Sequence, residues 1–426
     1  MATFKKDLIS VIISKTLIIV FGLMTTIIIA RTLGPEKNGI IASLLVYPVL
    51  FMSIGSLGVR QSTAFFLGKK IYKENELKKS ILHLWFFNSV ISMVACFFLI
   101  KFFSSNNLNN NLIFTAIAPI PFSLFNTYNS GIFLGKNEVG IFSKVNWIPK
   151  SVIFILTLYF ILYINYDIQG YLLALIGGPF IMFIFLLYRN KFLDVLSLKP
   201  DWRVLKDMFK LGSVYAFSLL IINLNYKIDI ILLDFLSSPF ETGIYSKGSS
   251  ITEYLWEIPM LLSTIVFSRS AISKEEKKFS MKVAQLLRIS LFIIGFGLLA
   301  LFLLSEYIIL GMFGDDFKGS ILVLNYLIPG VFFLTIFKVM NMDLAGKGKP
   351  WVSSKAMIPA LLINVIMNFI LIPKIGANGA AISSTLSYSF ASLLFLYLYS
   401  RETGISISEI ITFKKTDFTT IKNFFK

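Results

Sequence analysis

The sequence is short of charge, cysteine and histidine, and each shortage excludes a class of protein or site. Charged residues make up 15% of the 426 residues, against roughly 25% in an ordinary soluble domain. Cys96 is the only cysteine, so no intramolecular disulfide can form, and His83 is the only histidine, which excludes a histidine-rich metal site. We therefore expect neither a metal nor a cofactor.

Nucleotide-binding and redox motifs are also absent from the sequence. It contains no Walker loop, no glycine-rich dinucleotide loop and no CxxC pair. A transporter driven by ATP would have to obtain its motor from another chain.

Apolar residues, by contrast, are abundant and fall in long runs. They make up 56% of the chain, and the mean hydropathy is +0.77. A membrane-spanning helix needs about 20 mostly apolar residues to cross roughly 30 Å of hydrocarbon. We therefore predict an all-α polytopic membrane protein with about 12 transmembrane helices, at roughly 9–30, 40–60, 80–103, 112–135, 141–163, 169–188, 211–235, 243–268, 284–305, 320–342, 352–372 and 377–399. The first span has no small-residue cleavage site, so we expect a retained anchor rather than a signal peptide.

Positive charge is concentrated on alternate connections. One set holds 27 Lys and Arg residues and the other set holds four. The richer set consists of the N-terminus, Arg60 with 61–79, 136–140, 189–210, 269–283, 343–351 and the tail from Arg401. The positive-inside rule then predicts that both termini are cytoplasmic. The net charge of +17 is thus explained by topology, and no nucleic acid is expected as a partner.

The two halves of the chain resemble each other. Leu33–Ile40 is matched by Leu236–Ile244, and Leu134-Gly135-Lys136 is matched by Ala345-Gly346-Lys347. Six plus six helices in the same orientation form a parallel repeat, which favours a site between the halves near the midplane. The predicted organisation is an N-terminal six-helix lobe (1–190), a cytoplasmic linker (191–210), a C-terminal six-helix lobe (211–400) and a cytoplasmic tail (401–426).

Several of these segments carry a family resemblance. Ala30–Ile40 resembles the first loop of the polysaccharide exporters in the MATE-like (MOP) flippase superfamily. Asn225–Leu233 with Gly243–Ser246 is similar to their seventh and eighth helices, and Asn364–Pro373 with Gly376–Ile382 is similar to their eleventh and twelfth. The resemblance covers essentially the whole chain, and within the superfamily it is nearest to the O-antigen (Wzx-type) flippases.

The resemblance implies a fold, an activity and partners. Two six-helix lobes would form a V around a central cavity and work by alternating access. The chain would move an undecaprenyl-pyrophosphate-linked oligosaccharide from the cytoplasmic to the periplasmic face of a bacterial inner membrane. Coupling of this movement to an ion gradient is a separate hypothesis, which rests on the carboxylates described below. Partners would be this lipid-linked oligosaccharide, membrane lipids, and the repeat-unit polymerase and chain-length regulator of polysaccharide biosynthesis.

Cations inside the predicted spans are candidates for substrate binding, because ionisable groups are costly there. A cavity lined with Lys and Arg would offset the desolvation of a pyrophosphate. The alternative is snorkelling, in which long basic side chains reach the interface without a function, and we favour it for Lys101, Lys338 and Arg269. The candidates for substrate binding are Lys15, Arg60, Lys144, Lys150, Lys355 and Lys227.

Carboxylates inside the spans are candidates for ion coupling. Asp229 shares one helical stripe with Asn225 and Ser218, and Glu253 lies one turn from Glu257. A carboxylate in a medium of low dielectric favours its neutral form, which suits proton exchange during transport. The alternative is an internal ion-pair network, with Lys227 and Lys247 as the neutralising cations.

Other functions remain open at this point. A multidrug or organic-cation antiporter of the same superfamily would need a cavity lined with carboxylates, whereas the spans hold more basic than acidic groups. A membrane glycosyltransferase or polymerase would need clustered carboxylates or a large outer loop, and the longest outer connection, 306–319, has only three acidic residues. We therefore do not expect an enzyme, and the repeat argues against a pore-forming or scaffold subunit.

Overall fold

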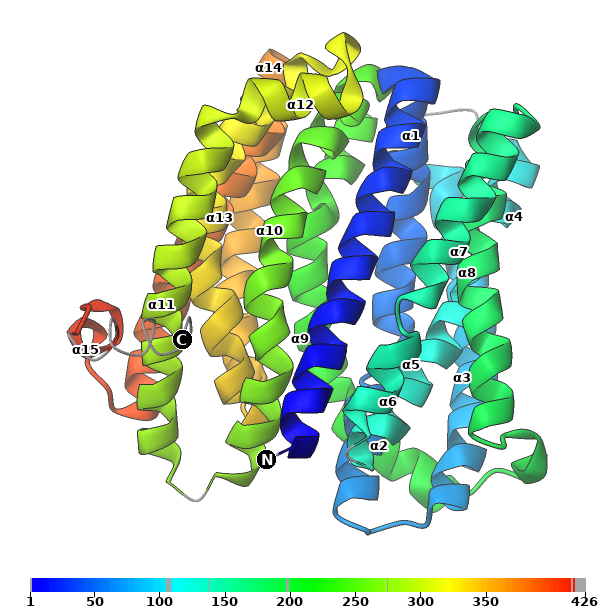
Figure 1. Ribbon diagram of the computed structural model, residues 1–426, viewed down its shortest axis with the longest axis vertical. Coiled ribbons are helices and arrows are strands. Elements are labelled where there is room, and N and C mark those ends of the chain that lie inside the picture. The colour runs from blue at the N-terminus through cyan, green and yellow to red at the C-terminus, as the bar shows by residue number, and fades with distance from the viewer. Residues whose placement is uncertain are drawn as a thin grey trace. The chain divides into compact units, whose positions relative to one another are not determined.

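The computed structural model consists of helices and short connections (Figure 1), with no strand among the residues that it describes. Those residues are 2–104, 109–136, 138–196, 199–273, 275–414 and 417. Side chains are described for them except at 2–9, 11, 139, 256–265, 268, 271 and 272. The predicted all-α class is confirmed.

The chain divides into two compact units, Met1–Asn223 (unit 1) and Leu224–Lys426 (unit 2). The division falls within a continuous helix, α9 (Trp202–Leu236). This helix begins inside the predicted linker 191–210. The lobes with the bounds given above, and the linker between them, stay a prediction.

Among the described residues, unit 1 contains eight α-helices besides the start of α9, together with two short helical turns. These are α1 (Ala2–Gly55), α2 (Val59–Gly68), α3 (Glu74–Phe103), α4 (Asn110–Ile117), α5 (Pro119–Gly135), α6 (Val139–Val145), α7 (Ile148–Thr157), the π-helical turn η1 (Leu158–Tyr163), α8 (Ile168–Arg189) and the 3₁₀ turn η2 (Leu193–Val195). Within this unit α2 packs on α5, α7 packs on α8, and α1 packs on α6 and α7.

Unit 2 begins within α9. It continues with α10 (Pro239–Ile272), α11 (Glu276–Leu303), α12 (Ser305–Phe313), the 3₁₀ turn η3 (Asp315–Phe317), α13 (Gly319–Gly346), α14 (Trp351–Thr403) and α15 (Ile407–Ile411). Helix α13 packs on α10, α11 and α14, so α13 occupies the interior of this unit.

Two helices are each long enough for two membrane spans, and a glycine divides both of them. A straight helix of the 54 residues of α1 would be about 81 Å long. Gly34 breaks α1 with φ 69° and ψ 176°, and Gly376 breaks α14 with φ 54°. A side chain would be strained at either angle. The predicted loops 31–39 and 373–376 are therefore tight breaks rather than extended connections.

Eight helical stretches of the described chain are long and apolar enough to cross a membrane, and the α1–α2 and α14 stretches each contain such a break. Helix α10 and the α4–α5 segment supply the remaining predicted spans. The protein is thus a multi-pass membrane protein whose fold accommodates about twelve spans.

The second predicted span, 40–60, ends too early. A turn at 56–58 interrupts the helix, but α2 then continues to Gly68. Gly58, at φ 58°, lies against Gly212 of α9: a Cβ atom on Gly212 would lie 2.1 Å from the carbonyl oxygen of Leu57. Only glycine allows the two backbones to approach this closely.

Each unit has one end that carries its basic connections, which we call its basic end. In unit 1 the connections of the basic end are 69–73, 136–138 and 190–201, and in unit 2 they are 273–275 and 347–350. The other end of each unit is called its distal end. The sequence predicts that the basic ends face the cytoplasm, and this orientation stays a prediction.

Candidate functional site

The most polar region inside unit 2 surrounds Asp229, whose side chain is 0% exposed. Helix α9 places it about 10 Å from the distal end, since α9 ends seven residues later at Leu236. Asn368 and Ser384, from the two arms of α14, each lie eight residues from the break at Gly376. Because the break reverses the chain, both residues come to the depth of Asp229.

The Asp229 carboxylate accepts three hydrogen bonds, all from neutral groups. Asn368 Nδ2 donates to Oδ1 at 2.8 Å. Ser384 Oγ donates to Oδ2 at 2.5 Å, and Tyr245 OH donates to the same oxygen at 3.0 Å. No Lys or Arg forms an ion pair with it among the described residues. The charge of this carboxylate is therefore balanced by dipoles and not by a fixed cation.

A second layer of amides and hydroxyls supports these contacts. Asn364 Oδ1 accepts a hydrogen bond from Asn368, and Ser387 Oγ donates to Asn225 Oδ1 at 3.1 Å. All four side chains are 0% exposed. Asn368 Oδ1 is buried without a hydrogen-bond partner among the described residues, so the cluster retains one unused oxygen acceptor near Asp229. We call Asp229, Asn225, Asn364, Asn368, Ser384, Ser387 and Tyr245 the Asp229 cluster.

Such a cluster can take up a proton or a small hard cation. Its oxygens come from a carboxylate, amides and hydroxyls, which are the ligands that hard cations prefer. The described residues contain no group of three or more His, Cys, Asp or Glu side chains that could hold a metal ion. One carboxylate among neutral donors suits the reversible exchange of a single positive charge.

The other predicted ion-coupling residues differ from Asp229. Glu253 Oε1 accepts a hydrogen bond from Lys227 Nζ at 2.7 Å, and both side chains are partly exposed. This pair matches the ion-pair alternative, and it uses Lys227, which was also a candidate for substrate binding. The Glu257 side chain lies outside the described residues.

Lys247, the other proposed neutralising cation, is 5% exposed on α10. It has no ion-pair partner in the part of the chain that the structure describes. A buried lysine without a counter-ion is costly in the membrane. Lys247 is therefore a further candidate functional residue of unit 2.

Asp343, at the basic end of unit 2, is another buried carboxylate, and it was not predicted from the sequence. Its oxygens accept from Ser270 Oγ, Ser280 Oγ and Tyr399 OH, each at 2.6 Å. Lys347 Nζ lies 3.1 Å from Oδ2. These contacts join α10, α11, α13 and α14, so Asp343 holds the basic end of the unit together.

Arg60 is partly buried on α2 of unit 1. Its Nε is buried without a hydrogen-bond partner among the described residues. It lies eight residues before the end of α2, and so deeper than the end of the second span where the sequence placed it. Helix α5 packs tightly against it, since a Cβ atom on Gly131 would lie 2.6 Å from the Arg60 carbonyl oxygen.

The remaining cations are more accessible. Lys15 is partly buried on α1 and Lys150 is exposed on α7, and each interacts with other residues of the chain. Lys355 is exposed on α14 with its ammonium group 4.3 Å from the centre of the Trp351 ring. The structure therefore does not bring the six predicted cations together within one unit.

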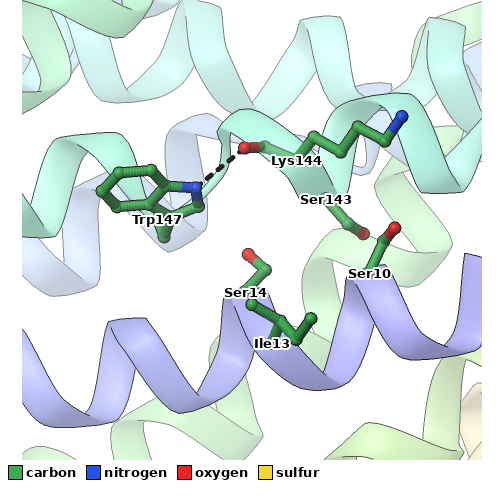
Figure 2. A pocket seen from close by; sticks show the side chains of 6 residues that line it. All are labelled: Ser10, Ile13, Ser14, Ser143, Lys144 and Trp147. Atoms are coloured by element: carbon green, nitrogen blue, oxygen red, sulfur yellow. Dashed lines mark hydrogen bonds between the residues drawn. The ribbon is translucent and has the colours of Figure 1, made fainter.

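Lys144 is the predicted cation that lines a pocket, which Figure 2 shows between α1 and the turn from α6 to α7. Trp147 Nε1 donates to the Lys144 carbonyl oxygen at 2.8 Å. Three serines complete the polar lining. Sequence reasoning found the lysine but not the serines, because hydroxyl groups are common in membrane helices.

Comparison with known proteins adds a family and a fold. A family model described as "Polysaccharide biosynthesis protein" matches residues 4–268. The chain is 24% identical over 388 residues to the capsular polysaccharide biosynthesis protein CapF of Staphylococcus aureus, which covers 88% of this chain and 94% of that protein. It is 23% identical over 391 residues to a putative O-antigen transporter of Shigella flexneri, with 88% and 92% covered.

Solved structures show a similar fold at low identity. An inward-facing multidrug resistance MATE family transporter of the MOP superfamily has a TM-score of 0.74 at 16% identity, over 92% of this chain and 95% of that one. The lipid II flippase MurJ, in an inward closed conformation, has a TM-score of 0.73 at 17% identity, over 97% and 89%. The predicted MATE-like fold class and the resemblance to this superfamily are confirmed.

Proposed function

Because the chain belongs to the polysaccharide biosynthesis protein family, we propose that it is a flippase for a lipid-linked oligosaccharide. The cargo would be an undecaprenyl-pyrophosphate-linked repeat unit of the O-antigen type, moved from the cytoplasmic to the periplasmic face of a bacterial inner membrane. The names of two relatives, a capsular polysaccharide biosynthesis protein and a putative O-antigen transporter, support this class of cargo.

One observation carries the proposal beyond the family. The helices of unit 1 hold Lys15, Arg60, Lys144 and Lys150 within their predicted spans, and no carboxylate accompanies these cations there. The acidic residues between positions 1 and 223 all lie outside the predicted spans. Cations without accompanying carboxylates favour an anionic headgroup such as a pyrophosphate and disfavour an organic cation.

Ion coupling is the second part of the proposal, and we assign it to the Asp229 cluster. The carboxylate is fully buried, it has no fixed counter-ion among the described residues, and Asn368 Oδ1 beside it is unused. Binding and release of a proton or cation there would change the hydrogen bonds that join α9, α10 and α14. Glu253 and Glu257 stay predictions for the same role.

The alternative is a multidrug or organic-cation antiporter, because a multidrug resistance transporter has a similar fold. The fold does not choose between the two, because both solved relatives share it. A cation exporter would use a carboxylate that its cargo can reach, whereas the Asp229 carboxylate is enclosed by its three donors.

The decisive experiment removes the protein from its host and follows the cargo. Deletion should cause lipid-linked repeat units to accumulate on the cytoplasmic side of the membrane, measured by extraction and mass spectrometry with an impermeant sugar-oxidising probe for sidedness. Expression of the full chain should restore export. Normal export in the deletion strain, together with increased sensitivity to cationic drugs, would instead establish the antiporter. Partners such as a repeat-unit polymerase and a chain-length regulator would be sought by crosslinking in the same strain.

A further inference from the structure

The pocket of Figure 2 lies at the basic end of unit 1, where α6 packs on the beginning of α1. Its volume is about 170 Å³, and its lining consists of Ser10, Ile13, Ser14, Ser143, Lys144 and Trp147. Neither the family model nor the names of the relatives assigns a role to these residues.

The polar side chains of the pocket come in two pairs, one on each wall. Ser10 and Ser14 lie one turn apart on α1, and Ser143 and Trp147 are four residues apart on the facing wall. Figure 2 shows the hydroxyls of Ser10 and Ser143 pointing toward each other, with the Ser14 hydroxyl directed into the space between the helices. The walls therefore present three hydroxyls to a single small volume.

Ser14 gives this pocket the character of a binding site. Its side chain is only 3% exposed, yet its Oγ has no hydrogen-bond partner among the described residues. Buried polar groups are almost always paired, and an unpaired one lowers stability. A ligand that accepts a hydrogen bond from this hydroxyl would remove the penalty.

The remaining lining residues indicate what such a ligand is. No carboxylate or amide side chain lines the pocket, so acceptors for the many hydroxyl donors of a sugar are few. Trp147 is already engaged, because its N–H donates to the Lys144 carbonyl and its ring stacks on Phe21 at 6.2 Å. A phosphate, in contrast, accepts hydrogen bonds from every hydroxyl present.

Lys144 supplies the matching charge. Its side chain is exposed at the edge of the pocket and forms no ion pair with any described residue. In Figure 2 the ammonium group extends past Ser143, away from Trp147. A flexible lysine in this position can close over an anion that the three hydroxyls hold.

We infer that this pocket binds a phosphate of the lipid-linked cargo as the cargo loads at the basic end of unit 1. The inference rests on the proposed function for the identity of the lipid. The proposed function gives unit 1 a general preference for anions. The present inference assigns one phosphate to a defined subsite made of Ser10, Ser14, Ser143 and Lys144.

The test is a binding measurement, which requires no transport. The full-length protein in detergent is titrated with undecaprenyl pyrophosphate that carries no sugar, and binding is followed by native mass spectrometry. Lys144→Gln and Ser14→Ala should each weaken binding about tenfold, the factor expected for one lost charge-assisted hydrogen bond. Lys144 is exposed, so its variant should fold normally even if Ser14→Ala does not.

Two matched variants serve as controls. Lys101→Gln removes an exposed lysine of α3 that bonds to Asn110, and Ser62→Ala removes a buried serine that already bonds to the Val59 carbonyl oxygen. Both should bind as the unaltered protein does. Phosphatidylglycerol is titrated in parallel, because a bilayer phospholipid could offer the same phosphate chemistry.

The outcomes separate this inference from the proposed function. Tight binding by the unaltered protein that neither pocket variant weakens would overturn the subsite and leave the flippase standing. Loss of phosphatidylglycerol binding alone in the variants would assign the pocket to a bilayer lipid, which also overturns the inference. Failure of the unaltered protein to bind undecaprenyl pyrophosphate would count against the proposed function itself.

Discussion

Units 1 and 2 differ in the ionisable groups that their predicted spans contain. The predicted spans of unit 1 hold Lys and Arg without carboxylates, whereas those of unit 2 hold Lys and Arg together with carboxylates, among them Asp229 and Glu253. Asp343 lies at the edge of the unit 2 spans. Thr26 and Thr25 lie 203 and 204 positions before Asp229, which is the spacing between the matched segments Leu33–Ile40 and Leu236–Ile244. Their hydroxyls bond to carbonyl oxygens of their own helix. Asp229 therefore has no ionisable counterpart at the positions that the predicted repeat assigns to it in unit 1.

The connections at the distal ends of the two units also differ in charge. At the distal end of unit 1, Lys37 bonds to Asp167 at 2.6 Å. The matching residue of unit 2, Glu241, instead accepts from the backbone N–H of Ala377 at 2.7 Å. In each unit the side chain at this position bonds to the start of a helix or of a helix arm. The charge of that side chain is positive in unit 1 and negative in unit 2.

The largest effect should follow from removing the Asp229 carboxylate, which has no counterpart at the matching place in unit 1. Asp229→Asn should reduce ion-driven flipping in proteoliposomes at least about tenfold, the consequence of about 1.4 kcal/mol, because the exchangeable charge is lost. Thr25→Ala, at the matching place in unit 1, should leave the rate unchanged. Full activity of Asp229→Asn in correctly folded protein would end the assignment of coupling to this cluster.

The next test compares the polar contacts near the two basic ends. Asp343→Ala should lower the free energy of unfolding by about 3–5 kcal/mol, because Lys347 loses its buried partner. In unit 1, Asn129 accepts a hydrogen bond from Asn190 at 2.7 Å, and Asn129→Ala should cost only about 1–3 kcal/mol. Unfolding in mixed detergent micelles measures both, and the reverse order would contradict this comparison.

A smaller difference is expected at the distal ends. Glu241→Ala removes a carboxylate that binds the start of a helix arm and should cost about 0.5–2 kcal/mol. Lys37→Ala breaks a pair whose side chains are 47% and 51% exposed, so the cost should stay below about 1 kcal/mol. Thermal unfolding at low and high salt separates them, since only the Lys37 variant should lose its effect when salt is added. Equal salt dependence of the two variants would contradict the expected difference between the Glu241 contact and the Lys37–Asp167 pair.

The smallest effect concerns the partly exposed pair of Lys227 and Glu253. A double-mutant cycle with Lys227→Met and Glu253→Gln should give a coupling below about 1 kcal/mol in unfolding experiments. Flipping by Glu253→Gln should fall less than flipping by Asp229→Asn. If Glu253→Gln proved the more damaging change, coupling would have to be moved from Asp229 to Glu253.

The sequence predicts Asp229 as a candidate because an ionisable group within an apolar run is conspicuous. Its partners could not be found in the same way. Asn368 and Ser384 lie 139 and 155 residues away along the chain, and neutral polar side chains are too common in membrane helices to stand out. Long-range packing, which composition does not report, brings them together.

Errors in the predicted ends of two spans explain the differences between prediction and structure at Asp343 and Arg60. Asp343 directly follows the predicted end of the tenth span at 342, so it was assigned to a connection, although α13 continues to Gly346. Arg60 was placed at a helix end because the sequence does not reveal that α2 resumes after the turn at 56–58. Breaks and continuations of this kind depend on tertiary contacts such as that between Gly58 and Gly212.

The single cysteine makes the orientation of the chain directly measurable. Cys96 is fully buried on α3, so an impermeant maleimide should leave the unaltered protein unlabelled. A reporter cysteine can then be placed at the exposed Lys73 of a basic end or the exposed Asp316 of a distal end. Intact cells should label Asp316→Cys and spare Lys73→Cys, so one chemical reaction would read out which surface of the membrane each end faces.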